Sequence, residues 1–112
     1  MKRTDTLKNN YEFRKMYAKG KSYHHPALIL YLMKNRAGIC RIGITTSKKI
    51  GNAVERNRCR RIIRAAYANL EDRIDGNYDI VLVARSRTKY LKSSDIEQIL
   101  LSQLTEAGAL NQ

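Results

Sequence analysis

One segment, residues 52–70, constrains the fold more than any other because its side chains divide sharply around a helix. At about 100° per residue, the apolar side chains gather on one side and the arginines occupy the rest. The apolar side holds Cys59, Ile62, Ile63, Ala66, Tyr67 and Leu70, and the arginine arc holds Arg56, Arg58, Arg60, Arg61 and Arg64. The chain must therefore build a core under one face of this helix and leave a strongly basic face uncovered.

The arginine arc indicates a site for phosphate groups. Like charges four residues apart in a helix cost a few tenths of a kcal/mol each, so the repulsion calls for an anionic partner. Arginine suits phosphate because its planar fork donates two parallel hydrogen bonds and stays charged. The alternative is a solvated surface, but such surfaces normally mix both signs of charge. Glu55 is the only acid in residues 51–70.

The charge of the whole chain supports a polyanionic partner. The 112 residues include 22 Lys and Arg and 10 Asp and Glu, for a net charge of +12. Three of the acids follow residue 94 and no base does, so the excess lies in residues 1–94. Such a field attracts nucleic acid above all, and an acidic membrane or an acidic protein less well.

Length and composition favour one compact unit in the cytoplasm. At 12.9 kDa and 43% apolar residues, residues 1–112 suit a single domain, with a flexible basic terminus at 1–6 and a frayed one at 109–112. No stretch approaches the roughly 18 apolar residues of a membrane span, and no secretory signal leads the chain. Cys40 and Cys59 lack the paired spacing of a zinc site, which predicts two core thiols.

The remaining pattern predicts the element order αβββαβα. Asn9 and Glu12 resemble a capping box that opens a helix over residues 9–19, and Ser94 and Glu97 resemble another that opens a helix ending before Gly108. Strands are expected at residues 22–25, 27–34, 39–46 and 78–84. A short turn predicts that strand 39–46 runs antiparallel to its predecessor. Both faces of strand 27–34 are apolar, so the second face must meet a helix or a ligand groove.

Residues 43–64 carry a resemblance to a known family. A strand ends in Ser-Lys-Lys at residues 47–49, followed by Gly-Asn-Ala-Val at 51–54, Arg-Asn-Arg at 56–58 and a basic helix. This run resembles the defining motif of bacterial ribonuclease P proteins, and the likeness extends over nearly the whole chain. Cys59 and Ala66 depart from the residues more common in that family, and the C-terminal tail is short and acidic instead of lysine-rich.

The resemblance implies a fold and a division of labour. The fold is a single-domain α+β, two-layer αβββαβα sandwich with a four-stranded sheet and a left-handed βαβ crossover, contrary to the usual hand. The RNA subunit of the enzyme cleaves the phosphodiester with Mg²⁺, and the protein binds that catalytic RNA and the single-stranded 5′ leader of precursor tRNA. No catalytic residue, metal site or protein partner is expected on this chain, whose sequence shows no His/Asp/Glu cluster for acid–base work.

Two surfaces follow from the resemblance. The side expected to bind the catalytic RNA comprises Lys48, Lys49, Asn52, Arg56, Asn57, Arg58 and Arg61. The cleft expected to hold the leader is lined by Phe13, Tyr17, Tyr31, Thr45, Arg60 and Arg64. Unpaired bases can stack on aromatic rings while arginines follow the backbone. A Phe/Tyr pair at helical spacing is more often part of a core, and the resemblance favours the stacking role.

Two other functions fit the charge. A ribosomal or ribosome-associated protein would share the basic composition without any link to an enzyme, and stimulation of a catalytic RNA would separate the two. A helix-turn-helix DNA regulator would need a second helix just before the arginine helix. Residues 39–46 read as a strand, which disfavours that function.

Overall fold

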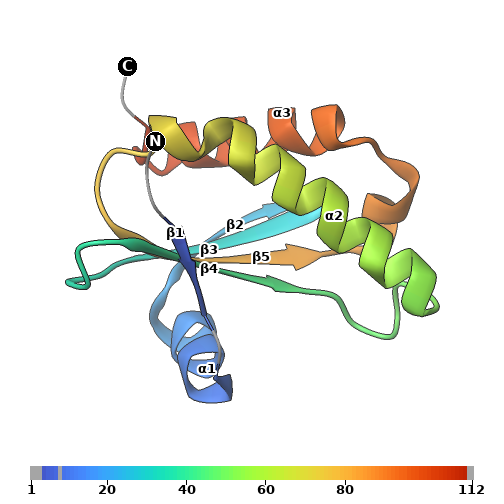
Figure 1. Ribbon diagram of the computed structural model, residues 1–112, viewed down its shortest axis with the longest axis horizontal. Helices are drawn as coiled ribbons and strands as arrows, with labels where there is room; N and C mark the ends of the chain where they lie inside the picture. The colour runs from blue at the N-terminus through green and yellow to red at the C-terminus, as the bar shows by residue number, and fades with distance from the viewer. Residues whose placement is uncertain (1–3, 8, 111–112) are drawn as a thin grey trace.

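The computed structural model describes residues 4–7 and 9–110. Within these residues the chain is a mixed α+β single domain with one five-stranded sheet and three α-helices (Figure 1). The elements are β1 Thr4–Thr6, α1 Asn10–Lys19, β2 Lys21–His25, β3 Leu28–Lys34, β4 Cys40–Thr45, α2 Ala53–Leu70, η1 Glu71–Arg73, β5 Tyr78–Ala84, η2 Ser86–Tyr90 and α3 Ser93–Glu106, where η marks a short 3-10 helix. The strand order across the sheet is β1-β4-β5-β3-β2.

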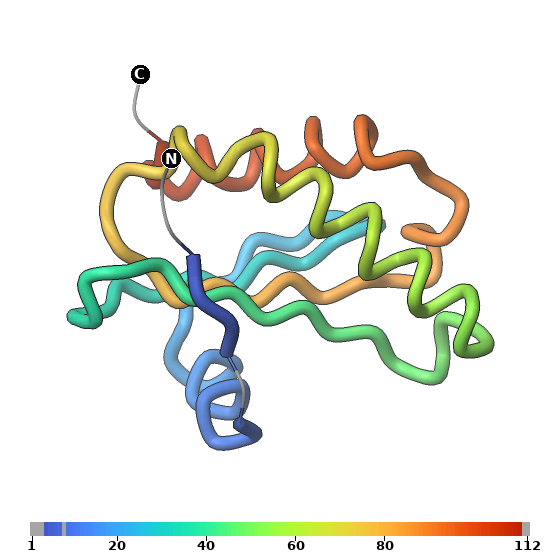
Figure 2. The backbone as a smooth tube through the Cα atoms, viewed as in Figure 1, coloured from blue at the N-terminus to red at the C-terminus, as the bar shows by residue number. Residues whose placement is uncertain are grey.

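Helices cover both faces of the sheet, unequally. Helices α2 and α3 lie over one face, and α1 lies against the other (Figures 1 and 2). Strand β3 alternates accordingly: Leu28, Leu30 and Leu32 are buried in the larger core, whereas Tyr31 and Met33 pack into a small cluster with Met16 of α1. The second apolar face of β3 thus meets a helix, one of the two alternatives expected for it.

Strand β4 pairs with β5 and not with β3, the neighbour expected from the sequence. Strand β5 pairs with β3 antiparallel and with β4 parallel, so it separates the two strands that a hairpin would have joined. The direction predicted for β4 is right, but its pairing with β3 is wrong. The cause is burial: Ile80 and Leu82 face the larger core while Val81 faces the smaller one, which favours a central strand. The unit β4-α2-β5 supplies the parallel crossover, whose left hand stays a prediction.

Described residues near both ends of the chain make contacts with the rest of the fold. Residues Thr4–Thr6 form β1, parallel to β4, so the sheet has five strands and not four. At the other end Ala109 is buried and its carbonyl accepts a hydrogen bond from the Asp75 N–H at 2.7 Å, and Leu110 bridges to Ile74. Residues 4–6 and 109–110 thus take part in the fold, and the flexibility expected of the two ends stays a prediction. Residues 1–3 and 111–112 lie outside the described residues.

The helix starts show which capping predictions hold. The Asn9 side chain accepts from the Glu12 N–H at 2.9 Å, as the first predicted box requires. Asn52 and Glu55 form a full capping box on α2 that was not predicted from the sequence. The box predicted for α3 is wrong, because the Asp95 carboxylate accepts the Lys92 N–H. Glu97 instead accepts from the Asn69 side chain at 2.7 Å and joins α3 to α2.

The structure also bears on the two cysteines and on membrane-spanning helices. Cys40 and Cys59 are free and buried, as predicted for core thiols. Among the described residues, no helix has the length and apolar character needed to span a membrane.

Candidate nucleic-acid interface

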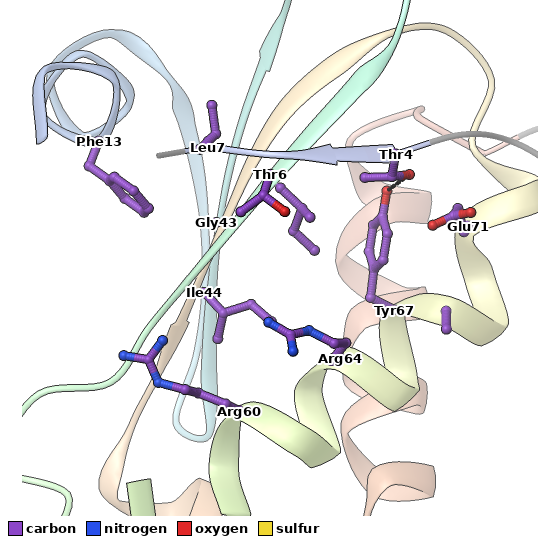
Figure 3. A pocket seen from close by; sticks show the side chains of 12 residues that line it. Thr4, Thr6, Leu7, Phe13, Gly43, Ile44, Arg60, Arg64, Tyr67 and Glu71 are labelled. Carbon is purple, nitrogen blue, oxygen red and sulfur yellow. Dashed lines mark hydrogen bonds between the residues drawn. The ribbon is translucent and has the colours of Figure 1, made fainter. Parts of the chain in front are cut away.

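A cleft runs between α1, β4 and α2. It consists of two adjoining hollows of about 500 and 550 Å³ that share Phe13, Ile44 and Arg60 as lining residues. The first hollow extends past Arg64 and Tyr67 toward β1 (Figure 3), and the second extends past Tyr17 and Thr45. The cleft predicted between the first helix, the sheet and the arginine helix is therefore present, with Phe13, Tyr17, Thr45, Arg60 and Arg64 all in its lining.

The Phe13 ring is seated on the backbone of β4. In Figure 3 it points from α1 toward Gly43. A Cβ atom at Gly43 would lie 2.5 Å from the Cε1 and Cζ atoms of Phe13, closer than carbon atoms approach. Glycine at this position therefore allows the ring to lie low in the cleft, half-buried, where one side remains accessible.

An ion-pair network holds α1 in place beside Phe13. Arg41 on β4 contacts Glu12 of α1 at 2.9 Å and Asp79 of β5 at 2.8 Å. Asp79 is only 5% exposed, and its carboxylate also accepts a hydrogen bond from Asn35 at 2.8 Å. The hydrogen bond to Asp79 raises the pKa of Arg41. Because Glu12 directly precedes Phe13 on α1, this network fixes the position of the Phe13 ring relative to the sheet.

Tyr17 presents a second aromatic ring at the rim of the cleft. Its side chain is 44% exposed, and its ring meets that of Tyr31 edge to face at 5.0 Å between centroids. Tyr31 projects from β3 and is absent from the lining of either hollow. The structure thus places Tyr31 behind Tyr17 as a support, not in the cleft where it was expected from the sequence. Edge-to-face pairs of this kind favour a fixed ring orientation.

Arginines from α2 form the opposite wall. Arg60 and Arg64 are both exposed and extend from α2 toward β4 in Figure 3. The Arg60 Nε–H donates to the Thr46 hydroxyl at 3.1 Å, which leaves the two terminal nitrogens of its fork for another acceptor. The cleft therefore pairs an aromatic side with a cationic side.

Sequence reasoning missed several lining residues. Those with a polar or charged group are Thr4, Thr6, Asn10, Arg14, Thr46, Tyr67 and Glu71. Arg14 could have been found, because it precedes Tyr17 by three residues and so shares its side of α1. Tyr67 was assigned to the buried face, and burial does raise its phenol pKa, but its hydroxyl also bonds to Thr4 at 3.1 Å at the end of the cleft.

The residues expected to bind the catalytic RNA differ in their surroundings. Lys48, Lys49, Asn57 and Arg61 are exposed. Asn52 is the N-cap of α2, and Arg56 donates to the Gly51 carbonyl at 2.8 Å. Arg58 is half-buried and donates to two carbonyls, that of Lys89 at 2.6 Å and that of Leu91 at 2.9 Å. Part of the predicted surface is therefore engaged in holding the fold.

The groups that line the cleft can bind nucleic acid. Residues 4–7 and 9–110 contain no group of three or more His, Cys, Asp or Glu side chains placed to hold a metal ion. Burial raises the pKa of the Cys59 thiol, which keeps it protonated and weakly nucleophilic. The arrangement offers rings for stacking and guanidinium groups for phosphates.

Comparisons with known proteins agree across the chain. The sequence model of the family named Ribonuclease P matches residues 1–108. The ribonuclease P protein component of Clostridium botulinum is 42% identical over 94% of this chain and 96% of its own length, and that of Clostridioides difficile is 43% identical over 86% and 85%. The solved RNase P protein of Staphylococcus aureus has a TM-score of 0.84 and 33% identity, covering 95% of this chain and 97% of that one.

Proposed function

The chain belongs to the ribonuclease P protein family, and on that premise we propose that it is the protein subunit of a ribonuclease P. In this proposal it binds the catalytic RNA and the single-stranded 5′ leader of precursor tRNA, and so assists removal of the leader. The observation that carries the proposal is the cleft, which sets Phe13 and Tyr17 opposite Arg60 and Arg64.

The chemistry of the cleft supports an unpaired strand as its ligand. Splayed bases have free faces that can stack on Phe13 and Tyr17, whereas a duplex buries those faces in its own stack. The arginines opposite can contact the phosphates of the same strand. None of these contacts reads a particular base, which suits a leader whose sequence differs from one precursor to the next.

The exposed basic residues at the start of α2 support a second surface for structured RNA. Lys48, Lys49, Asn57 and Arg61 lie outside the lining of the cleft and are open to solvent. Phosphates on a folded RNA can be neutralised by such side chains without any base being unpaired. We propose that this side docks on the catalytic RNA.

The proposed division of labour assigns the chemistry to the RNA. The Mg²⁺ ions of the reaction would be held by the RNA subunit, and the protein would orient the leader at a fixed distance from them. Such a complex would work in the bacterial cytoplasm. The family membership favours this function over that of a ribosomal protein with similar charge.

Reconstitution tests the proposal directly. Purified protein should stimulate cleavage of precursor tRNA by the ribonuclease P RNA of the same organism at low Mg²⁺, and should cleave nothing when all RNA is removed from the preparation. Protein that binds the RNA but leaves cleavage unchanged would contradict the proposed role. Nuclease activity of the RNA-free protein would contradict the division of labour.

A further inference from the structure

One exposed aromatic residue lies away from the cleft. Tyr90, the last residue of η2, is 77% exposed. A ring this exposed adds little burial to the fold and offers its face to a ligand.

The turn that carries Tyr90 is fixed on both sides. The Arg58 guanidinium donates to the carbonyl of Lys89 at 2.6 Å and to that of Leu91 at 2.9 Å, the two residues that flank Tyr90. Within η2, the buried Thr88 hydroxyl donates to the Ala27 carbonyl at 2.6 Å, and the Leu91 N–H donates to the Thr88 carbonyl at 3.1 Å. The backbone of residues 88–91 is therefore tied to α2 and to the residue that precedes β3, while the Tyr90 ring is exposed.

Lysine side chains lie near the turn that carries the ring, and one of them is also paired with an acid, since the Lys89 ammonium lies 3.7 Å from the Glu55 carboxylate. The Lys89 ammonium lies 5.3 Å from the centroid of the Tyr90 ring and donates to the Ile50 carbonyl at 2.8 Å. This bond brings η2 beside the segment that carries Lys48 and Lys49, both exposed. An aromatic ring on a fixed turn, with Lys89 beside it and exposed lysines on the adjoining segment, matches a nucleotide, whose base can stack on the ring while its phosphates meet the lysines.

We propose that Tyr90 is a stacking platform for an unpaired base of the catalytic RNA, and that Arg58 is a positioning residue which holds this platform. The inference rests on the proposed function and sharpens it. Arg58 then contributes to RNA binding through the two carbonyls on either side of Tyr90, and its guanidinium does not contact a phosphate.

Rigidity is what makes the platform effective. A stacking residue on a mobile loop loses conformational entropy when the base binds, and this loss reduces affinity. Two hydrogen bonds from one planar guanidinium fix the turn before the RNA arrives. Lysine cannot reproduce this geometry, because its single ammonium is a point donor and cannot span both carbonyls as a fork does.

The first test is the affinity of Tyr90 variants for the ribonuclease P RNA of the same organism, without substrate. Tyr90→Ala should weaken binding by roughly 5- to 150-fold, the equivalent of one stacked base, and Tyr90→Phe should bind like the wild type because the ring remains. Tyr11→Ala is the matched control: Tyr11 is 67% exposed on α1 and should not affect binding. The salt dependence of binding should stay unchanged in Tyr90→Ala, because stacking releases no counterions.

The second test separates positioning from direct contact by Arg58. Arg58→Lys keeps the charge, so a phosphate contact would largely survive, whereas the paired hydrogen bonds to the Lys89 and Leu91 carbonyls would be lost. We expect Arg58→Lys to weaken binding by at least about twofold in the wild-type background and to have a smaller effect in the Tyr90→Ala background, since coupled residues are not additive. Equal losses in both backgrounds would overturn the positioning role.

The outcomes distinguish this inference from the proposed function. If the wild-type protein does not bind the catalytic RNA, both fail. If the wild type binds and Tyr90→Ala binds equally well, only the platform is overturned, and the exposed ring would then point to a protein partner. Thermal unfolding of each variant shows whether the fold is intact, and Tyr90→Phe keeps the platform testable if Tyr90→Ala lowers stability.

Discussion

Two pairs of arginines on α2 use the same side chain differently. Toward the N-terminus, Arg56 and Arg58 donate to main-chain carbonyls and are half-buried. Toward the C-terminus, Arg60 and Arg64 are exposed in the cleft wall. The helix itself is continuous, so the difference comes from what each side chain meets in the rest of the fold.

This difference shows how a basic motif can be both scaffold and ligand surface. Carbonyl oxygens that would otherwise be poorly satisfied at a turn accept hydrogen bonds from the first group of arginines. Where the neighbouring surface is a hollow and not a turn, the same fork remains available for phosphate. The charge of the motif alone therefore does not identify the residues that touch RNA.

The largest expected effect is on the free energy of unfolding, from the arginines that donate to main-chain carbonyls. Arg58→Ala removes two hydrogen bonds from a charged donor to half-buried carbonyls and should lower the free energy of unfolding by about 2 to 4 kcal/mol. Arg61→Ala, three residues along the helix and exposed, should change it by less than about 0.5 kcal/mol. Urea unfolding of the two variants measures both. Equal stabilities for these variants would remove the distinction between the two groups of arginines.

The next effect comes from moving the Phe13 ring without replacing any aromatic residue of the cleft. Gly43→Ala places a methyl group where the Phe13 ring now lies, so the ring must move. We expect the preference of the holoenzyme for precursor over mature tRNA to fall by roughly 5-fold or more, the equivalent of one stacked base. Binding of mature tRNA should hardly change. An unaltered preference would show that the position of Phe13 does not matter to the leader.

A smaller effect is expected from the cationic wall. Replacing Arg60 and Arg64 with Ala should reduce the log–log salt slope of precursor binding by up to about 0.7 for each single-strand phosphate that is no longer neutralised. The slope for mature tRNA should be unchanged, because no leader occupies the cleft. The comparison is made by titrating both tRNAs into holoenzyme over a range of salt concentrations. A slope reduced equally for both tRNAs would place these arginines on the tRNA body.

The alkaline behaviour of the protein gives the smallest effect. Burial raises the pKa of Cys59, Tyr67 and Tyr78 above their ordinary values of about 9 and 10. The unfolded chain then loses these protons first as the pH rises, so the free energy of unfolding should fall above about pH 9.

Tyr67→Phe should lessen the alkaline loss and cost about 1 kcal/mol at neutral pH through removal of the bond to Thr4. Urea unfolding between about pH 8 and about pH 11 measures both effects. Identical alkaline slopes for the wild type and this variant would contradict the role assigned to Tyr67.

Periodicity and capping predicted the elements that carry the site. The apolar side of α2 and the Asn9 cap of α1 follow from residues within one helix, and the run Tyr78–Ala84 is apolar enough to be recognised as a strand. The cleft followed from the family resemblance, and five of its six expected lining residues are there.

What the sequence missed depends on partners far along the chain. The carbonyls bound by Arg58 lie 31 and 33 residues away from it, beyond any local pattern. Strand β1 is three polar residues with no alternation to mark it, and it is a strand only because β4 offers a free edge. Both faces of the strand that carries Tyr31 are apolar, so its sequence does not show which residues line the cleft. Only the contact between the Tyr31 and Tyr17 rings shows that Tyr31 supports Tyr17 and does not line the cleft itself.

The most direct test of the leader cleft is the ratio of precursor to mature tRNA affinity in holoenzyme assembled with Tyr17→Ala. Tyr17 is exposed, so the substitution should leave the fold intact, and Tyr11→Ala on the same helix controls for the removal of an exposed ring. We predict that the ratio falls by roughly 5-fold or more while mature tRNA binds as before. If both tRNAs lose affinity equally, or neither does, the cleft does not hold the leader.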